Sequence, residues 1–289
     1  MRLVTFRAGD GARVGAFVGP EEVADLGVVA ASMAELIAGG EAALSRARAA
    51  LEAAPRHALA SVTLLAPIPR PARNVFLVGK NYHEHAKEFA GSGFDGSATE
   101  VVPEAPVVFT KPPSAVIGPG EAIPGHLDPT NSTDYEGELA VVIGSGGRGI
   151  AKADALRQVF GYTIVNDVTA RTLQHKHRQW VLGKGIDGFC PMGPAILTAD
   201  EAPDPTKLRL RTWVNGEPRQ DATLADLIFD IPTLIETISA GITLEPGDVI
   251  ATGTPVGVGL GFSPPKFLKA GDVVRIEVDG IGVLENPVA

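Results

Sequence analysis

The segment Asp134-Tyr-Glu-Gly-Glu-Leu-Ala-Val-Val-Ile143 combines an acidic beginning with an apolar, β-branched end. A run of this composition favours a β-strand, in which side chains two positions apart point to the same face. Glu136 and Glu138 therefore lie on one face of the predicted strand. We expect Gly137, which stands between them, to leave room between the two carboxylates.

A second apolar run, Gly161-Tyr-Thr-Ile-Val-Asn-Asp167, ends in a carboxylate where a strand gives way to a polar turn. Binding residues concentrate in such turns. Three oxygen ligands without a histidine or cysteine suit a hard cation such as Mg2+, Mn2+ or Ca2+ and argue against zinc. Glu136, Glu138 and Asp167 are thus the predicted metal ligands. The alternative is that one or two of them are ordinary solvated charges.

The composition is that of a globular protein. The chain has 289 residues, of which 45% are hydrophobic and 20% charged, and a net charge of -9, which makes nucleic acid an unexpected partner. A single cysteine, Cys190, excludes an intramolecular disulfide and fits a reducing compartment. No apolar stretch approaches the roughly 20 residues of a membrane span. These observations predict a cytoplasmic protein that has no membrane contact.

The chain is longer than a usual single domain of about 100 to 150 residues, which suggests two domains. Residues 1–65 form a predicted small N-terminal α/β domain, with short strands followed by alanine-rich helices. Ser32 and Glu35 have the spacing of a capping box at a helix start. The proline-rich residues 66–71 favour an extended connector, so we place the catalytic domain at residues 70–289.

The second domain is strand-rich and has few helices, which predicts an α+β, β-dominated fold. Its predicted strands are residues 74–78, 107–109, 138–143, 163–166, 208–214, 248–252 and 273–278. Two hairpins are predicted at Asn215-Gly216 and Asp279-Gly280, because these dipeptides tolerate the positive φ angles of type I′ turns.

His85 and Glu88 lie three residues apart in a predicted short helix and share one face of it. A carboxylate beside an imidazole orients it as a general base, although many such pairs are only solvated surface contacts. Residues 91–99, which are rich in glycine and small polar residues, are predicted to be a lid or else a surface connector. Two histidine pairs, His83 with His85 and His175 with His177, have members two residues apart. Because such positions diverge on a helix, we interpret His83, His175 and His177 as surface residues.

Residues 144–149, Gly-Ser-Gly-Gly-Arg-Gly, match the G-x-G-x-x-G pattern of dinucleotide-binding proteins. Two features oppose this rival interpretation. The preceding strand begins with two glutamates on one face, and residues 150–152 separate the glycines from the predicted helix start. A nucleotide-dependent oxidoreductase is therefore the less favoured alternative.

Together these segments resemble the fumarylacetoacetate hydrolase family, and in particular its two-domain bacterial members. The resemblance extends from about residue 70 to the last residue and is weaker before that. The matching stretches are residues 79–88, 109–114 with 117–120, 134–143, 166–171, 183–194 and 252–259.

The resemblance implies a mixed β-sandwich roll, usually homodimeric, with Mg2+ or Mn2+ bound by the three carboxylates; Ca2+ would fit in a crystal. It also implies a catalytic dyad at His85 and Glu88 and a catalytic lysine at Lys184, for which a plain salt bridge is the alternative. The substrate-contacting positions that it implies are Arg171, Gln174, Gly253 and Thr254. Lys80 departs from the hydrophobic or arginine residue often found there, and residues 131–133 have no assigned role.

The resemblance further implies a 2-oxo acid substrate with a second carbonyl group. We expect a metal-dependent hydrolase that cleaves a C–C bond in acylpyruvates and related diketo acids, with His85 activating water and Lys184 stabilising negative charge. The runner-up is a decarboxylase or a tautomerase/isomerase of oxaloacetate-like acids at the same site. A metal-dependent binder of organic acids is a third possibility, and it leaves the dyad and the lysine without a purpose.

Overall fold

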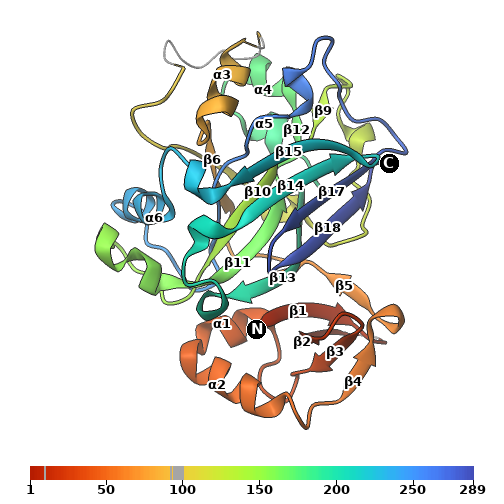
Figure 1. Ribbon diagram of the computed structural model, residues 1–289, viewed down its shortest axis with the longest axis vertical. Helices are drawn as coiled ribbons and strands as arrows, with labels where there is room; N and C mark the ends of the chain where they lie inside the picture. The colour runs from red at the N-terminus through yellow and green to blue at the C-terminus, as the bar shows by residue number, and fades with distance from the viewer. Residues whose placement is uncertain (10, 92, 94–100) are drawn as a thin grey trace.

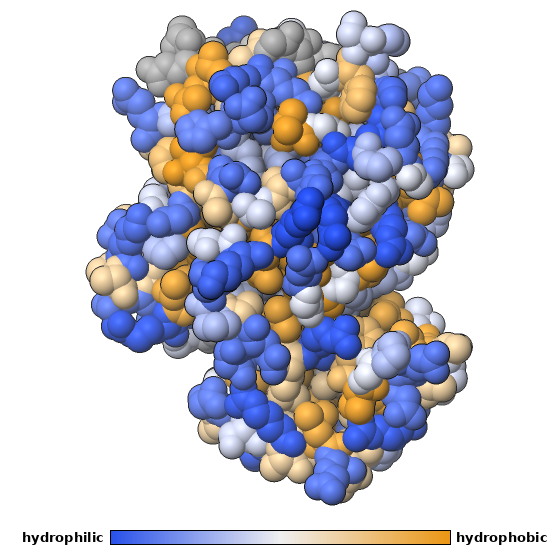
Figure 2. Space-filling model, viewed as in Figure 1, coloured by the Kyte–Doolittle hydropathy of each residue, from blue (hydrophilic) through white to orange (hydrophobic). Residues whose placement is uncertain are grey.

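The computed structural model describes residues 1–9, 11–91, 93 and 101–289. A small lobe formed by the N-terminal residues lies at one end of the molecule, and the rest of the chain forms a larger body (Figure 1). The surface narrows between the lobe and the body, and the face shown in Figure 2 is mainly polar with small apolar groups. No helix among the described residues is long and apolar enough to cross a membrane.

Strands dominate the described residues, as predicted. The α-helices are α1 (Met33–Ala38), α2 (Gly40–Ala50), α3 (His83–Gly91), α4 (Arg171–His177), α5 (Val181–Lys184) and α6 (Ile231–Ser239). The strands are β1 (Arg2–Arg7), β2 (Ala12–Val18), β3 (Glu22–Asp25), β4 (Arg56–Ala58), β5 (Thr63–Leu65), β6 (Val75–Gly79), β7 (Val107–Lys111), β8 (Val116–Ile117), β9 (Thr133–Asp134), β10 (Gly137–Ile143), β11 (Val159–Asn166), β12 (Thr169–Ala170), β13 (Cys190–Thr198), β14 (Arg209–Val214), β15 (Glu217–Thr223), β16 (Val249–Ala251), β17 (Val273–Val278) and β18 (Gly282–Pro287).

The largest sheet has the strand order β4-β3-β2-β1-β13-β11-β10-β16-β6-β7, with β5 paired to β1 and β8 to β13. The sheet is mixed, because β16 runs parallel to β6 while β10 is antiparallel to both β11 and β16. Its middle strands therefore come from distant parts of the chain. This topology brings the end of β11 beside the start of β10.

A four-stranded sheet, β15-β14-β17-β18, packs against β10 and β11. Val141 and Ile164 of the large sheet share one core with Leu210 and Ile276 of the smaller sheet. The two sheets come so close at Gly137 that a Cβ there would lie 3.3 Å from Ile276 Cγ2 and would overlap Thr212 Oγ1. Gly137 therefore makes room for the second sheet, and our expectation that it separates the two glutamates is wrong.

The N-terminal lobe is hydrogen-bonded to the body, because β1 pairs with β13 at Arg2–Leu197 and Leu3–Ile196. One buried core contains Leu36 of α1 together with Ile196 of β13. The helix start at Ser32 is confirmed, since Ser32 Oγ accepts the Glu35 N–H. The division into two domains at residues 65–70 stays a prediction.

Each of the seven strands predicted in the second domain is confirmed, with boundaries shifted by a few residues. The hairpin at Asn215-Gly216 is confirmed, and both residues have positive φ. The hairpin at Asp279-Gly280 is not a two-residue type I′ turn, because Val278 pairs with Gly282 across three residues. Cys190 is buried.

Candidate metal centre and active site

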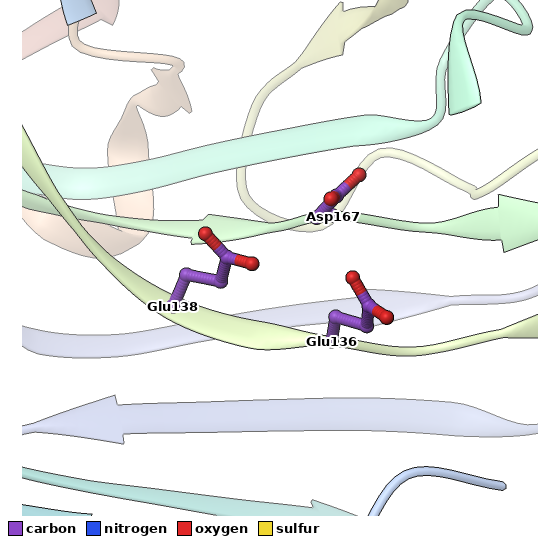
Figure 3. A group of neighbouring side chains, drawn as sticks. All are labelled: Glu136, Glu138 and Asp167. Carbon is purple, nitrogen blue, oxygen red and sulfur yellow. The ribbon is translucent and has the colours of Figure 1, made fainter. Parts of the chain in front are cut away.

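Glu136, Glu138 and Asp167 come together at the junction of β10 and β11 (Figure 3). Each offers a carboxylate oxygen within 4.8 Å of the others, and all three residues are buried. The backbone fixes this junction, because Asp167 N–H donates to Glu136 C=O and Glu136 N–H donates to Asn166 Oδ1. The interpretation of these carboxylates as solvated surface charges is therefore wrong.

Lys184, the last residue of α5, contacts two of the three carboxylates. Its Nζ donates to Glu136 Oε2 at 2.8 Å, to Asp167 Oδ2 at 2.6 Å and to Thr169 Oγ1 at 2.9 Å. Burial opposes the charged form, but Asp167 and Glu136 outweigh burial and raise the pKa of Lys184. The ammonium is thus held beside the candidate metal site.

A second buried lysine, Lys111 of β7, lies on the other side of Asp167. Its Nζ donates to the carbonyl groups of Val168, Lys184 and Phe189, which use all three protons of an ammonium. The same nitrogen is 2.9 Å from Asp167 Oδ1, yet Oδ1 accepts no hydrogen bond from any described residue. Lys111 therefore attracts this oxygen electrostatically from within the buried site.

Arg171, the first residue of α4, joins Glu136 to a fourth buried carboxylate. Its Nε donates to Asp134 Oδ2 at 2.9 Å, and its Nη1 is 2.6 Å from Glu136 Oε1. The start of α4 is held by Ser132, whose carbonyl and hydroxyl oxygens accept the N–H groups of Arg171 and Thr172. These contacts give Ser132, one of the previously unassigned residues 131–133, a structural role.

The two glutamates are in opposite electrostatic states. Burial would raise the pKa of Glu136, but Arg171 and Lys184 hold it well below its usual range. Burial, followed by the charges of Asp167 and Glu136, raises the pKa of Glu138 well above its usual range. Without a metal ion, the site therefore contains too little positive charge to offset the charge of an ionised Glu138.

A divalent cation fits this set of residues. The three ligand atoms are carboxylate oxygens, Asp167 Oδ1 accepts no hydrogen bond within the described part of the chain, and burial with two neighbouring carboxylates raises the pKa of Glu138. Hard cations such as Mg2+ and Mn2+ prefer oxygen ligands of this kind. Among the described residues this is also the one group of three acidic, histidine or cysteine side chains close enough to hold a metal ion.

His85 of the predicted dyad lines a cavity beside these carboxylates. His85 Nδ1 is 3.0 Å from Glu88 Oε2 on α3, and both side chains are largely buried. A small cavity of about 20 Å³ is lined by twelve residues that include His85, Glu136, Glu138 and Lys184. A larger hollow of about 790 Å³ on another part of the surface contains none of these groups. The small cavity is the better candidate site because the predicted base, the lysine and two of the metal-ligand carboxylates line it.

The four predicted substrate contacts also lie at the site. Arg171, Gln174 and Thr254 line the cavity, and Gly253 N–H donates to Glu138 Oε2 at 2.9 Å. Thr254 Oγ1 donates to Gly137 C=O and accepts a bond from Gln220. Gly253 and Thr254 therefore hold β10 in place, whatever contact they make with a substrate.

Two residues that we did not predict complete the cluster, namely Lys111 and Asp134. Both stand in motifs quoted for the family resemblance, but neither shows a local pattern that indicates its partner. His83, His175 and His177 are exposed, as predicted. Most of the predicted lid at residues 91–99 lies outside the described residues.

The glycine-rich residues 144–149 do not form a phosphate-binding loop. The Gly147 N–H donates to Leu244 C=O and the Gly149 N–H to Ser239 C=O, so these amides already have partners. The following segment, Lys152–Gln158, is a 3-10 helix rather than an α-helix. These contacts agree with our preference against a dinucleotide site.

Comparisons with known proteins agree with the family resemblance seen in the sequence. The family model described as "Fumarylacetoacetate (FAA) hydrolase C-terminal" matches residues 74–289. Oxaloacetate tautomerase YisK of Bacillus subtilis (strain 168) is 48% identical over 273 residues, which cover 91% of this chain and 88% of that protein.

Two solved structures share the fold. A fumarylacetoacetate hydrolase from psychrophilic Exiguobacterium antarcticum has a TM-score of 0.85 and 44% identity, covering 100% of this chain and 99% of that one. A maleylpyruvate hydrolase from Sphingobium sp. SYK-6, in complex with a manganese(II) ion and pyruvate, has a TM-score of 0.81 and 36% identity at the same coverage. The chain belongs to the fumarylacetoacetate hydrolase family and has its β-dominated fold.

Proposed function

We propose that this protein is a divalent-metal-dependent enzyme that interconverts the keto and enol forms of an oxaloacetate-like 2-oxo acid. The observation that carries the proposal is the buried triad of Glu136, Glu138 and Asp167 with Lys184 bound to two of its members. The name of the Bacillus relative supports the choice of reaction. This reaction is the tautomerase alternative to the C–C bond hydrolysis that the sequence favours.

Glu136, Glu138 and Asp167 would hold the ion, and Mg2+ or Mn2+ suits them, the latter also present in the maleylpyruvate hydrolase structure. When bound, the ion supplies Lewis-acid polarisation of the 2-oxo group and so favours the enolate. The Lys184 ammonium lies beside the same carboxylates and stabilises negative charge that develops on the substrate oxygen.

His85 is the proposed proton carrier between carbon and oxygen. With Nδ1–H donated to Glu88, the neutral ring keeps an unprotonated Nε2 that can take a proton from the carbon next to the carbonyl. The resulting imidazolium can return this proton to the enolate oxygen or to carbon. The imidazole lines the cavity that also contains Glu138 and Lys184, so proton transfer and charge stabilisation occur at one place.

C–C bond hydrolysis of acylpyruvates is the second candidate, and the His85–Glu88 pair is the observation that favours it. A histidine base oriented by a carboxylate can also take a proton from water, which then attacks the distal carbonyl group. In that reaction Lys184 stabilises or protonates the leaving carbon. Two of the solved relatives are named as hydrolases.

The deciding experiment offers both substrate types to one enzyme preparation saturated with Mg2+. Ketonisation of freshly dissolved enol-oxaloacetate is followed by ultraviolet absorbance, and acylpyruvate cleavage is followed by loss of the diketo chromophore. We expect rapid, EDTA-sensitive ketonisation, which His85→Ala slows by about 100- to 10,000-fold. Turnover of acylpyruvates alone would replace the tautomerase proposal by the hydrolase, and no turnover of either would reject both.

A homodimer is proposed as the assembly, following the family resemblance. Light scattering of the purified protein tests this proposal, and a monomeric mass would contradict it.

A further inference from the structure

The dyad is carried by a helix that cannot hold its position alone. Helix α3 has nine residues, whereas isolated helices shorter than about 12 residues are marginal in water. Its outward residues His83, Glu84 and Lys87 are exposed. The location of His85 therefore depends on what the buried side of α3 contacts.

Glu88 and Phe89 attach this side to residues 257–261. Glu88 Oε2 is paired with His85, while its Oε1 accepts the Gly257 N–H at 3.0 Å. Phe89 is buried in a separate small core with Val258 and Leu260. One carboxylate thus fixes the imidazole and docks the helix at the same time.

Gly261 makes this docking sterically possible. A Cβ at position 261 would overlap the Glu88 carboxyl group and come within 2.7 Å of its Cγ. The φ angle of Gly261 is outside the positive region, so an alanine there meets no backbone strain. Since the obstructed group is a flexible side chain, alanine would displace Glu88 rather than unfold the segment.

The opposite side of residues 257–261 is held by Asp134. Its Oδ1 accepts the Gly259 N–H at 2.7 Å, and its Oδ2 accepts the Leu260 N–H at 3.0 Å. The same Oδ2 accepts Arg171 Nε, and Arg171 contacts Glu136. A continuous set of charge-assisted bonds therefore joins the metal-site carboxylates to the surface on which the dyad rests.

We propose that residues 257–261 form a docking cradle for α3, and that Gly261 and Asp134 are positioning residues for the His85–Glu88 dyad. Gly261 admits the Glu88 carboxylate, and Asp134 ties the cradle to Arg171 and thus to Glu136. This inference rests on the proposed function only for its effect on turnover. The placement of α3 is testable without a substrate.

The first test compares Gly261→Ala with Gly241→Ala, a matched control whose Cβ would have no neighbour within 4 Å. Hydrogen–deuterium exchange of α3 amides should accelerate at least about tenfold in Gly261→Ala, and α6 should be unchanged. Affinity for Mn2+ should stay within about twofold of wild type. With oxaloacetate, kcat should fall about 100-fold and KM less than about threefold, because misplacing a catalytic group by about 1 Å has that effect.

The second test uses Asp134→Asn, which keeps the shape of the side chain. Its amide NH2 group replaces one of the two oxygens that accept hydrogen bonds, and therefore faces a donor. We expect faster exchange in α3 together with weaker Mn2+ binding, since Arg171 loses its partner beside Glu136. Unchanged α3 exchange in Gly261→Ala would overturn the cradle even if the enzyme acts on 2-oxo acids. Absent turnover in wild type would reject the proposed function and leave the exchange test intact.

Discussion

Replacing Glu138 by glutamine should show that this carboxylate destabilises the metal-free protein and is needed to bind the metal ion. Glu138 has oxygens within 4.8 Å of those of Asp167 and Glu136. At an effective dielectric constant of about 20, two charges at this distance repel by about 3.5 kcal/mol. Glu138→Gln removes both repulsions while glutamine Oε1 can still accept the Gly253 N–H, so the metal-free variant should be at least as stable as wild type at neutral pH.

The raised pKa of Glu138 determines how the stability of wild type relative to Glu138→Gln changes with pH. Because the folded-state pKa of Glu138 is raised above its ordinary value of 4.5, its contribution to stability is full below pH 4.5 and is lost as pH rises toward the folded-state pKa. Within that window the free energy of unfolding of wild type should fall by up to about 1.4 kcal/mol per pH unit relative to Glu138→Gln.

Urea unfolding in EDTA at pH 5 to 8 measures the difference in stability between wild type and Glu138→Gln. The same measurement with added Mn2+ tests whether Glu138 is a metal ligand. Manganese at about 100 times its dissociation constant should restore about 2.7 kcal/mol to wild type and much less to the variant, which lacks one carboxylate ligand. Parallel stability curves for the two proteins over this pH range would refute the reasoning. Equal stabilisation by Mn2+ would remove Glu138 from the ligand set.

Three further outcomes are expected. Glu136→Ala should lose Mn2+ binding by titration yet keep a cooperative melting transition, because Lys184 retains Asp167 and Arg171 retains Asp134; undiminished affinity would contradict the site. Lys111→Met should lower the free energy of unfolding in urea by about 3–5 kcal/mol, since it strips a buried charge from its partners, and a loss below about 1 kcal/mol would be inconsistent with that role. Wild-type protein should leave NADH fluorescence unchanged, and saturable binding would revive the dinucleotide alternative.

The strands that carry the metal ligands could be predicted because their patterns are local. Period-2 alternation placed Glu136 and Glu138 on one face, and the end of an apolar run located Asp167. Strand β13 was missed although it is fully buried, because Pro191 and Pro194 interrupt its pattern and proline normally argues against a central strand. Pro194 falls where the pairing of β11 with β13 shifts in register, which is a place that accommodates it.

The supporting charges could not be predicted, because their partners are distant in sequence. Lys111 meets the carbonyl of Phe189, and Asp134 meets the amides of Gly259 and Leu260. No local pattern of apolar or polar residues encodes such contacts, which depend on the strand order of the large sheet. Edge strand β15 was missed for another reason, since its sequence, Glu217–Thr223, is mostly polar.

The pairing of β1 with β13 also has a consequence for synthesis on the ribosome. Arg2 pairs with Leu197, and at roughly 5–20 residues per second the two are made about 10 to 40 s apart. Strands β1 to β4 can pair locally during that interval, and β5 can pair with residues 5–7 of β1. The part of β1 that later receives β13, Arg2 and Leu3, stays open. Nascent chains stalled before residue 190 should therefore be the ones that bind a chaperone most strongly.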